Sequence, residues 1–363
     1  MALAPLIVMA PAVRVLIVDD SVVARVVLTR LVQADGRFMV VAAVGTIAAA
    51  LQFLTDEAVD IILLDVALPG VDGLTALPDM LAAGRGARIV IVSSSAGDGA
   101  ATTVQALALG AADTLEKPDA SGLSSDFGRR LVDRLSRLSD RSTTGRAPTP
   151  APIALAPITL TSVAPPPRTA EDAYDIVAIG ASTGGIHALG QMLRALPPTF
   201  RLPILVTQHL PTSFMPYFAA QLALMAGRPC DVATDRLRIR PGRLIVAPGD
   251  AHLRCVSLGE GNAAVRLTTD PAASGCLPSV DPMLSSLAEV FGRRLMAVVL
   301  SGMGRDGAEG ARRVRAAGGC VVVQDQASSV VWGMPGAIAM QGLADAVLPP
   351  DAIGRLVATR RRP

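Results

Sequence analysis

Lysine is almost absent from this chain of 363 residues: among the 33 basic residues, Lys117 is the only lysine. Histidine occurs three times, and aromatic residues make up 3% of the sequence. The 33 basic residues nearly balance 31 acidic ones, which leaves a formal net charge of +2. A chain so balanced in charge and so poor in stacking side chains argues against nucleic acid as a partner.

Long apolar segments and paired cysteines are also missing. The most apolar long stretch, residues 38–54, is shorter than the roughly 20 residues of a membrane-spanning helix, and Asp56 and Glu57 follow it. The apolar N-terminus carries no basic residue before Arg14, unlike a secretory signal peptide. The four cysteines form no CxxC pair, so we expect neither a disulfide framework nor a zinc knuckle. These features predict a cytoplasmic protein without membrane insertion.

A proline-rich segment divides the chain. Residues 141–171 contain seven prolines, with Ser, Thr and Ala between them. Such a composition cannot hold a helix or a strand ladder and is typical of an extended, semi-rigid linker. The sequence therefore predicts an N-terminal extension over residues 1–11, a first domain over 12–140 and a second domain over 172–360.

In the first domain, short β-type runs alternate with helical patterns. This alternation predicts an α/β fold with a parallel, doubly wound sheet of five strand–helix units. The predicted strands cover residues 13–18, 38–44, 60–64, 88–92 and 112–115, and the last helix covers 124–139. Pro78 lies inside the third helical pattern, where we expect it to end or kink the helix early.

The second domain repeats this logic with longer loops. Its predicted strands cover residues 175–179, 203–207, 243–246, 295–300 and 319–324. Residues 256–258 and 265–267 flank a glycine-containing turn and read as a hairpin. We therefore expect a second doubly wound parallel α/β domain with a small antiparallel hairpin.

Carboxylates cluster where strands of the first domain end. Asp19 and Asp20 follow the first predicted strand, and Asp65 follows the third. The carboxyl ends of parallel strands frame the ligand crevice of an open sheet, and converging carboxylates need a cation such as Mg²⁺. Lys117 follows the fifth strand and is placed to reach the same crevice. Each residue alone has an ordinary explanation as a turn, helix cap or solvated side chain.

This domain resembles the receiver domain of bacterial response regulators, which has a flavodoxin-like (βα)5 fold. The resemblance lies in four motifs: VLIVDDS at 15–21, LLDVALPGVDG at 63–73, IVSS at 91–94 and EKP at 116–118. It implies that Asp65 receives a phosphoryl group from a histidine kinase.

The resemblance also implies roles for the residues around Asp65. Mg²⁺ would be held by Asp19, Asp20, Asp65 and the backbone carbonyl of Ala67, while Ser93 and Lys117 would contact the phosphoryl oxygens. The chain departs from the family pattern at one position, because Thr114 stands where an aromatic switch residue is usual. This departure puts the aromatic relay in doubt but not the phosphorylation chemistry.

In the second domain, Ser182 lies in Gly180-Ala181-Ser182-Thr183-Gly184, directly after a predicted strand. Gly-x-Ser-x-Gly between a strand and a helix is the pattern of a nucleophile elbow. A helix cap and a phosphate cradle are the alternatives. A P-loop needs a lysine that this half lacks, and a dinucleotide site needs an acid where residues 176–230 hold none. Acyl transfer therefore gains weight.

A nucleophilic serine needs a base and an orienting acid. Of the three histidines, His187 is expected on the helix after Ser182, pointing away from it, and His252 in a loop. His209 follows the predicted strand 203–207 and would emerge beside Ser182, so we favour it over His252. Asp306, in a glycine-rich loop after a later strand, is the candidate acid, although a turn aspartate is its ordinary interpretation.

The second domain resembles the catalytic domain of the CheB family, the chemotaxis protein-glutamate methylesterases. The matching motifs are IGASTGG (179–185), TQHLP (207–211), VAPGD (246–250), PSVDPML (278–284), LSGMGRDG (300–307) and VWGMPGAI (331–338). The resemblance implies Ser182 as nucleophile, His209 as general base and then acid, and Asp306 as its orienting partner. Backbone N–H groups near Met303 or Thr183 would form the oxyanion hole.

The two resemblances together imply a regulated hydrolase. It would hydrolyse glutamate γ-methyl esters on chemoreceptors, deamidate certain receptor glutamines, and need no cofactor beyond Mg²⁺ in the receiver. The chemotaxis kinase CheA would supply the phosphoryl group, and an unphosphorylated receiver would act as a brake. We expect a monomer. The alternatives are a receiver-controlled binding module without turnover, and the same esterase in a non-flagellar chemosensory pathway.

Overall fold

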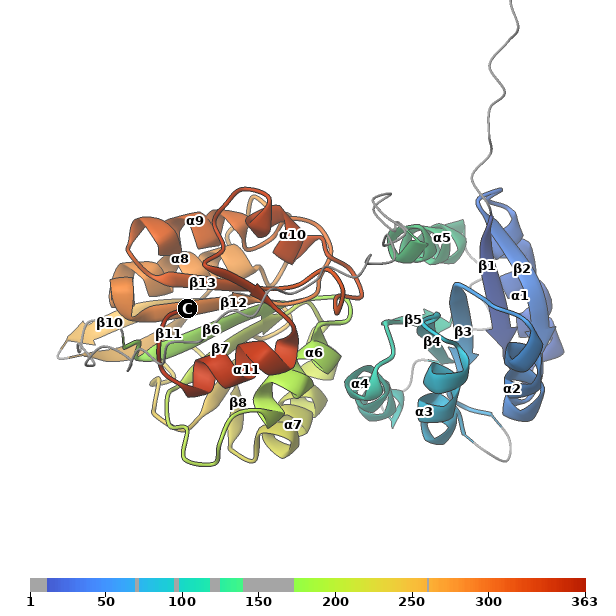
Figure 1. The fold of residues 1–363 in the computed structure, drawn as a ribbon, viewed down its shortest axis with the longest axis horizontal. Helices are drawn as coiled ribbons and strands as arrows, with labels where there is room; N and C mark the ends of the chain where they lie inside the picture. Colours follow the sequence, from blue (N-terminus) through green and yellow to red (C-terminus); the bar gives the residue numbers. More distant parts are fainter. Residues whose placement is uncertain (1–11, 69–71, 95–97, 118–124, 140–172, 260) are drawn as a thin grey trace, which may run out of the picture.

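The structure is a computed structural model, and it shows two α/β domains (Figure 1). It describes residues 12–68, 72–94, 98–117, 125–139, 173–259 and 261–363. The predicted extension over 1–11 and the proline-rich linker over 141–171 lie outside the described residues. The domain boundaries that depend on them therefore stay predictions.

The first domain contains a five-stranded parallel sheet in the order β2-β1-β3-β4-β5, which confirms the predicted flavodoxin-like fold. Helices α1 and α5 pack on one face of this sheet, and α2, α3 and α4 on the other. The elements are β1 (Val13–Val18), α1 (Val22–Gln33), β2 (Phe38–Val44), α2 (Ile47–Asp56), β3 (Ile61–Asp65), α3 (Gly73–Ala83), β4 (Arg88–Ser94), α4 (Asp98–Leu109), β5 (Asp113–Lys117) and α5 (Ser125–Ser139).

The expectation that Pro78 ends or kinks its helix early is wrong as to length, because α3 continues to Ala83. Proline inside a helix costs about 3 kcal/mol through a lost hydrogen bond and a clash. Leu77 and Met80, on either side of the proline, are fully buried against the sheet. Burying two such side chains stabilises by about 3–6 kcal/mol, enough to offset the proline.

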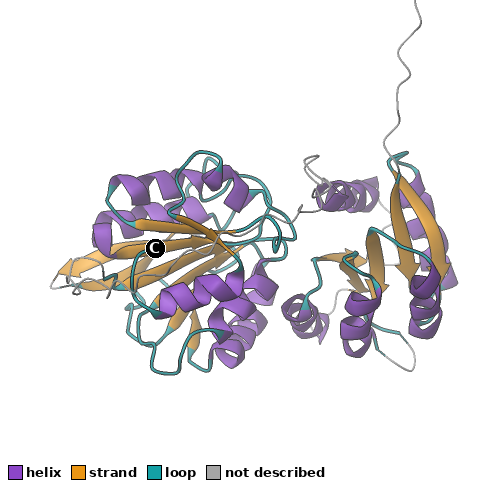
Figure 2. Ribbon diagram, in the orientation of Figure 1, coloured by secondary structure: helices purple, strands orange, loops and turns teal. Residues whose placement is uncertain are grey.

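The second domain is a seven-stranded sheet in the order β14-β13-β12-β6-β7-β9-β8, accompanied by the predicted antiparallel hairpin β10-β11. Figure 2 shows helices on both faces of this sheet. The strands are β6 (Ile176–Ala181), β7 (Ile204–Gln208), β8 (Cys230–Val232), β9 (Leu244–Val246), β10 (His252–Gly259), β11 (Asn262–Thr268), β12 (Leu295–Val299), β13 (Cys320–Gln324) and β14 (Ala346–Leu348). The doubly wound architecture is thereby confirmed.

The helices of the second domain form two layers. Helices α6, α7 and α11 cover one face, and α8, α9 and α10 cover the other together with the hairpin. Their bounds are α6 (Gly185–Arg194), α7 (Met215–Ala226), α8 (Val280–Phe291), α9 (Ala308–Ala316), α10 (Met334–Ala339) and α11 (Pro350–Ala358), with short 3₁₀ turns at Thr212–Phe214 and Gly292–Arg294. No helix in the described part of the chain has the length and apolarity to cross a membrane.

The two domains share a continuous interface. Helix α4 of the first domain packs against α6 and α7 of the second, and one cluster of buried apolar residues has members in both. Hydrogen bonds cross this interface, among them one from Gly184 N–H to the Ala112 carbonyl at 3.1 Å and one from His187 Nδ1–H to the Ala108 carbonyl at 3.0 Å. The first domain thus contacts the helix that begins just after Ser182.

Candidate functional site

Ser182 lies in a tight turn between β6 and α6. Its N–H donates to the Ser301 carbonyl at 3.0 Å, and its own carbonyl accepts from Gly185 N–H at 2.8 Å. Gly184 has φ +74°, and a Cβ there would lie 2.4 Å from Val330, so a glycine is needed on both counts. This geometry is that of the predicted elbow, with the hydroxyl presented beyond the end of the strand.

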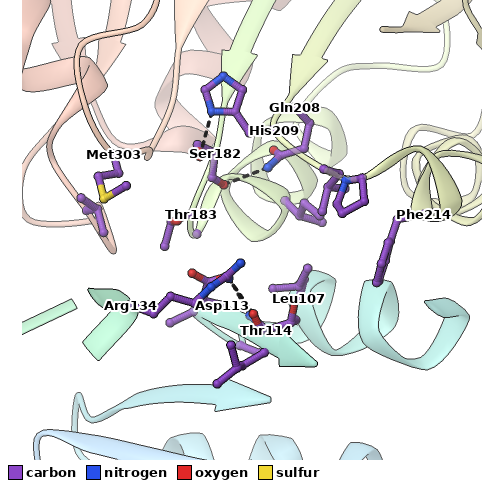
Figure 3. A pocket seen from close by; sticks show the side chains of 18 of the residues that line it. Leu107, Asp113, Thr114, Arg134, Ser182, Thr183, Gln208, His209, Phe214 and Met303 are labelled. Carbon is purple, nitrogen blue, oxygen red and sulfur yellow. Dashed lines mark hydrogen bonds and ion pairs between the residues drawn. The ribbon is translucent and has the colours of Figure 1, made fainter. Parts of the chain in front are cut away.

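His209 lies directly after β7, the neighbour of β6 in the sheet. Its Nδ1 is 3.1 Å from Ser182 Oγ, and its Nε2 is 2.8 Å from Asp306 Oδ2. These contacts fit a ring that accepts the Ser182 proton at Nδ1 and donates Nε2–H to Asp306. The structure thus brings the three predicted residues together from β6, β7 and the loop after β12 (Figure 3 shows Ser182 and His209).

Asp306 is buried among donors that hold its charge. Oδ1 accepts from Ser279 Oγ–H at 2.6 Å, and Oδ2 accepts from Val280 N–H at 2.8 Å. Burial alone would raise the pKa of Asp306, but the bonds from His209 and Ser279 outweigh it and lower that pKa to about 2. The carboxylate therefore stays ionised and available to orient the imidazole.

The imidazole of His209 is itself shifted. Burial would lower its pKa, but the hydrogen bond to Asp306 and the nearby Cys276 thiol raise the pKa of His209 to about 9. Cys276 lies in the loop between β11 and α8, and it was missed at the sequence level, as was Ser279. Nothing marks a single loop cysteine, whereas Ser279 belongs to the PSVDPML motif and was there to be found.

The other two histidines have structural partners. His187 projects from α6 to the first domain, where it bonds the Ala108 carbonyl, so the expectation that it points away from Ser182 is confirmed. His252 begins β10 and is buried, with its ring between the Asp270 carbonyl and the Ser279 N–H. Neither ring is placed to serve Ser182.

The two residues predicted to supply an oxyanion hole, Thr183 and Met303, line the same cavity as Ser182. Among the described residues, the N–H groups of Thr183 and Met303 make no hydrogen bond. The Met303 loop approaches closely, since a Cβ on Gly302 would lie 2.9 Å from Ser182 Cβ. Figure 3 places Thr183 and Met303 on the same side of the nucleophile.

Ser182 and His209 face a cavity of about 590 Å³ that both domains line. From the first domain, Leu107, Thr114 and Arg134 form the opposite wall (Figure 3). Arg134 is held there by bonds to the Asp113 carboxylate and the Thr114 carbonyl. The first domain therefore forms one wall of the site.

The acidic residues of the first domain also converge. One carboxylate oxygen from each of Asp19, Asp20 and Asp65 lies within 4.8 Å of the others. Lys117 Nζ is 2.7 Å from Asp19 Oδ2 and 2.7 Å from Asp65 Oδ2. Burial would lower the pKa of Lys117, but these two carboxylates raise it. An all-oxygen donor set with an ammonium beside it fits a hard divalent cation such as Mg²⁺.

The remaining predicted residues of this cluster are only partly described. The Ala67 N–H donates to Asp65 Oδ1 at 3.1 Å. The role of the Ala67 carbonyl as a Mg²⁺ ligand stays a prediction. Ser93 lies in β4, next to β3, and its side chain is outside the described part. Thr114, in β5, lines the interdomain cavity.

Comparisons with known proteins agree with both halves of this description. A family profile described as CheB methylesterase matches residues 177–357, and one described as response regulator receiver domain matches residues 15–125. The catalytic domain of the Thermotoga maritima CheB methylesterase superimposes with a TM-score of 0.50 at 35% identity, covering 51% of this chain and 98% of that one.

Curated relatives match along nearly the whole length. A protein-glutamate methylesterase/protein-glutamine glutaminase from Caulobacter vibrioides is 40% identical, covering 96% of this chain and 99% of the relative. One from Paramagnetospirillum magneticum is 39% identical, covering 93% of each chain. The chain therefore belongs to the CheB family, the hydrolases that join a response-regulator receiver to a methylesterase domain.

Proposed function

We propose that this enzyme removes methyl groups from glutamate γ-methyl esters of chemoreceptors and deamidates certain receptor glutamines, with Ser182 as nucleophile. The observation that carries the proposal is the relay Ser182–His209–Asp306, with contacts of 3.1 Å and 2.8 Å. Both substrates present a side-chain acyl carbon bearing a small leaving group, so the same attack serves both.

Each residue of the relay has a defined step. Ser182 Oγ attacks the ester carbonyl while its proton passes to His209 Nδ1. Asp306 stabilises the resulting imidazolium through Nε2–H, and His209 then protonates the departing methoxide so that methanol leaves. Water attacks the acyl-serine by the reverse sequence and regenerates a glutamate carboxylate. Proton transfer of this kind contributes about 10²–10⁴-fold to the rate.

The tetrahedral intermediate needs donors for its oxyanion. We assign this role to the N–H groups of Thr183 and Met303, two residues that line the cavity with Ser182 and whose N–H groups make no hydrogen bond among the described residues. Backbone donors fixed by the surrounding fold cost no reorganisation as negative charge develops, and one such donor is worth about 10²–10³-fold in kcat.

The receiver would be phosphorylated on Asp65 by the chemotaxis kinase CheA. Asp19, Asp20 and Asp65, with the Ala67 carbonyl, would hold Mg²⁺, whose charge neutralises the incoming phosphoryl oxygens when bound. Lys117 and Ser93 would contact those oxygens. Lys117 already lies against the Asp65 carboxylate at 2.7 Å, which supports this assignment.

Strand β5 offers a direct route from phosphorylation to the esterase. Its last residue, Lys117, bonds Asp65, and the Ala112 carbonyl just before its start accepts from Gly184 N–H in the catalytic elbow. A phosphoryl group on Asp65 would change the pairing of Lys117, shift β5 and release α4 from α6 and α7. The receiver would then cease to cover the cavity. This route runs through the main chain of β5 and needs no aromatic side chain at position 114.

We further propose domain boundaries at residues 12–140 and 172–360 and a cytoplasmic monomer that meets receptors from the cytoplasmic side. Whether the enzyme serves a flagellar or a non-flagellar pathway depends on which receptors its surface fits, and not on the triad.

The proposed function is tested by methanol release from methylated receptors with and without a small-molecule phosphodonor. Ser182→Ala should lower release by at least about 10⁴-fold, because no other hydroxyl of the described residues bonds His209. Ser257→Ala, an exposed serine of the hairpin, is the matched control and should retain the full rate. Release that persists in Ser182→Ala would exclude this nucleophile, and folded wild-type protein without turnover would indicate a binding module.

A further inference from the structure

Cys276 lies beside the proposed triad but takes no step in the proposed hydrolysis. Its sulfur, a ring nitrogen of His209 and a carboxylate oxygen of Asp306 lie within 4.8 Å of one another. The residue is half-buried and lines the interdomain cavity with Ser182 and His209. A thiol, an imidazole and a carboxylate therefore converge at one accessible point.

We propose that His209, Cys276 and Asp306 form a binding site for a soft divalent cation, best matched by Zn²⁺, and that its occupancy reversibly inhibits the esterase. The inhibitory consequence rests on the proposed role of His209 as base, whereas the metal site itself does not.

The donor set distinguishes this site from the acidic cluster of the receiver. Sulfur, nitrogen and oxygen ligands together favour Zn²⁺, whereas oxygen ligands alone favour Mg²⁺. Ligand atoms around one tetrahedral zinc lie about 3–4 Å apart, given bond lengths of about 2.0–2.3 Å. The observed upper limit of 4.8 Å is close to this, so small side-chain movements suffice. Water from the cavity would supply the fourth ligand.

The loop that carries Cys276 is tied to Asp306 by a chain of hydroxyl groups. Cys276 N–H donates to Ser274 Oγ at 3.3 Å, Ser274 Oγ–H donates to Ser279 Oγ at 3.1 Å, and Ser279 Oγ–H donates to Asp306 Oδ1 at 2.6 Å. Outer hydrogen bonds of this kind fix the ligands of protein metal sites. The backbone that carries the thiol is thus held beside the site.

Binding follows simple chemistry. The thiol proton passes to solvent, the imidazole proton that now lies between His209 and Asp306 is replaced by one on Nδ1, and the cation takes the lone pairs of the thiolate sulfur and of Nε2 and a carboxylate oxygen. No redox change is involved. With an imidazole nitrogen coordinated and the ring held by the metal, His209 no longer accepts the Ser182 proton.

Cobalt(II) provides a direct probe, because a cobalt–thiolate bond gives a near-ultraviolet charge-transfer band that oxygen and nitrogen ligands do not give. Co²⁺ is titrated into full-length Ser182→Ala in the presence of excess Mg²⁺, which occupies the receiver cluster. We expect the band with one equivalent of Co²⁺ and its loss in Ser182→Ala/Cys276→Ser. The double variant Ser182→Ala/Cys230→Ser is the matched control, since Cys230 is half-buried in the far edge strand β8.

The inhibitory effect is measured separately, on methanol release by enzyme with Ser182 intact. Zinc should inhibit the wild type and Cys230→Ser equally, and Cys276→Ser should need at least about 10-fold more zinc for half-inhibition relative to its own zinc-free rate. Absence of the charge-transfer band in Ser182→Ala would overturn the site. Equal zinc sensitivity of Cys276→Ser and wild type would overturn the inhibition. Because the band is read in a variant without the nucleophile, its failure is distinguishable from failure of the proposed hydrolysis.

Discussion

The two functional clusters occupy equivalent places in their domains but are built around charge in different ways. Each lies at the carboxyl edge of a parallel sheet, the usual ligand site of an open α/β fold. The receiver gathers three carboxylates around one ammonium. The esterase gathers one hydroxyl, one imidazole and one carboxylate. The fold therefore fixes the place of each site, and the residues that follow each strand fix its chemistry.

Asp65 and Asp306 make the contrast concrete, because both carboxylates are buried. Asp306 accepts hydrogen bonds from Ser279 Oγ–H and Val280 N–H. Because these donors are fixed by the loop and by the start of α8, the carboxylate remains in place as an anion. Asp65 is met by the side chain of Lys117, a flexible ammonium that can move to a phosphoryl oxygen. One carboxylate is placed to orient a ring, and the other to be modified.

The largest expected effect comes from exchanging each of these carboxylates for an amide. Asp306→Asn should lower kcat by about 10⁴-fold, because the imidazole loses its orientation and its counter-charge. Asp65→Asn should keep the basal rate and lose only the stimulation by a phosphodonor. Methanol release measured with and without phosphodonor distinguishes the two variants.

The exposed helix residue Asp351, paired with Arg355, offers a matched control for both variants. Asp351→Asn should change neither the basal nor the stimulated rate. The contrast between the clusters would fail if Asp65→Asn reduced the basal rate as severely as Asp306→Asn does.

The rate of the esterase should depend on pH through His209. His209 must be neutral to accept the Ser182 proton, and its pKa is raised to about 9. Below that value kcat/KM should fall by about tenfold for each pH unit, since the neutral fraction falls in proportion. Cys276→Ala should move this profile toward lower pH, because the thiol contributes to the shift.

The profile is measured on methylated receptor, with the receiver domain kept unphosphorylated at every pH. A flat profile between pH 6 and 9 would mean that the imidazolium form does not limit the reaction, against the assignment of His209 as base.

The meeting of Ser182 and His209 could be predicted from the sequence because the signal is local. Ser182 and His209 each follow a short, strongly apolar strand, and neighbouring strands in such a sheet bring their next residues together. Cys276 was missed because it lies in a loop between a hairpin and a helix, where no periodicity indicates which residues meet, whereas Ser279 was overlooked although the PSVDPML motif contains it. Their proximity to His209 or Asp306 is a property of the tertiary fold.

The fold was predictable to a similar degree. Strands such as β1 and β2 match their predicted bounds, since continuous apolar runs mark them. The edge strands β8 and β14, three residues each with no buried residue, were missed, whereas the equally short but buried β9 was predicted. The extent of α3 past Pro78 was misjudged because local propensity cannot weigh the burial of Leu77 and Met80.

A smaller effect is expected at the interface that connects the two clusters. His187→Ala removes one hydrogen bond to α4 and so loosens the docked receiver, which should raise the basal rate by about two- to tenfold. The fully stimulated rate should not change. Gln191→Ala is the control, because Gln191 bonds His187 and not the receiver. An unchanged basal rate in His187→Ala would argue against this contact as part of the brake.

The smallest effect is expected at Thr114, the position usually held by an aromatic residue. Because the proposed route runs through the β5 main chain, Thr114→Ala should change phosphodonor stimulation by less than about twofold. Loss of stimulation in this variant would show that the side chain carries the signal after all.

The central claim is that a modification at Asp65 uncovers a reactive serine in the other domain. It is tested most directly by the labelling rate of Ser182 with a serine-directed phosphonate, followed by mass spectrometry of the modified peptide. The account predicts slow labelling of the unphosphorylated chain, faster labelling with a phosphodonor, and no acceleration in Asp65→Asn. Equal labelling rates with and without phosphodonor, or label on a serine other than Ser182, would contradict it.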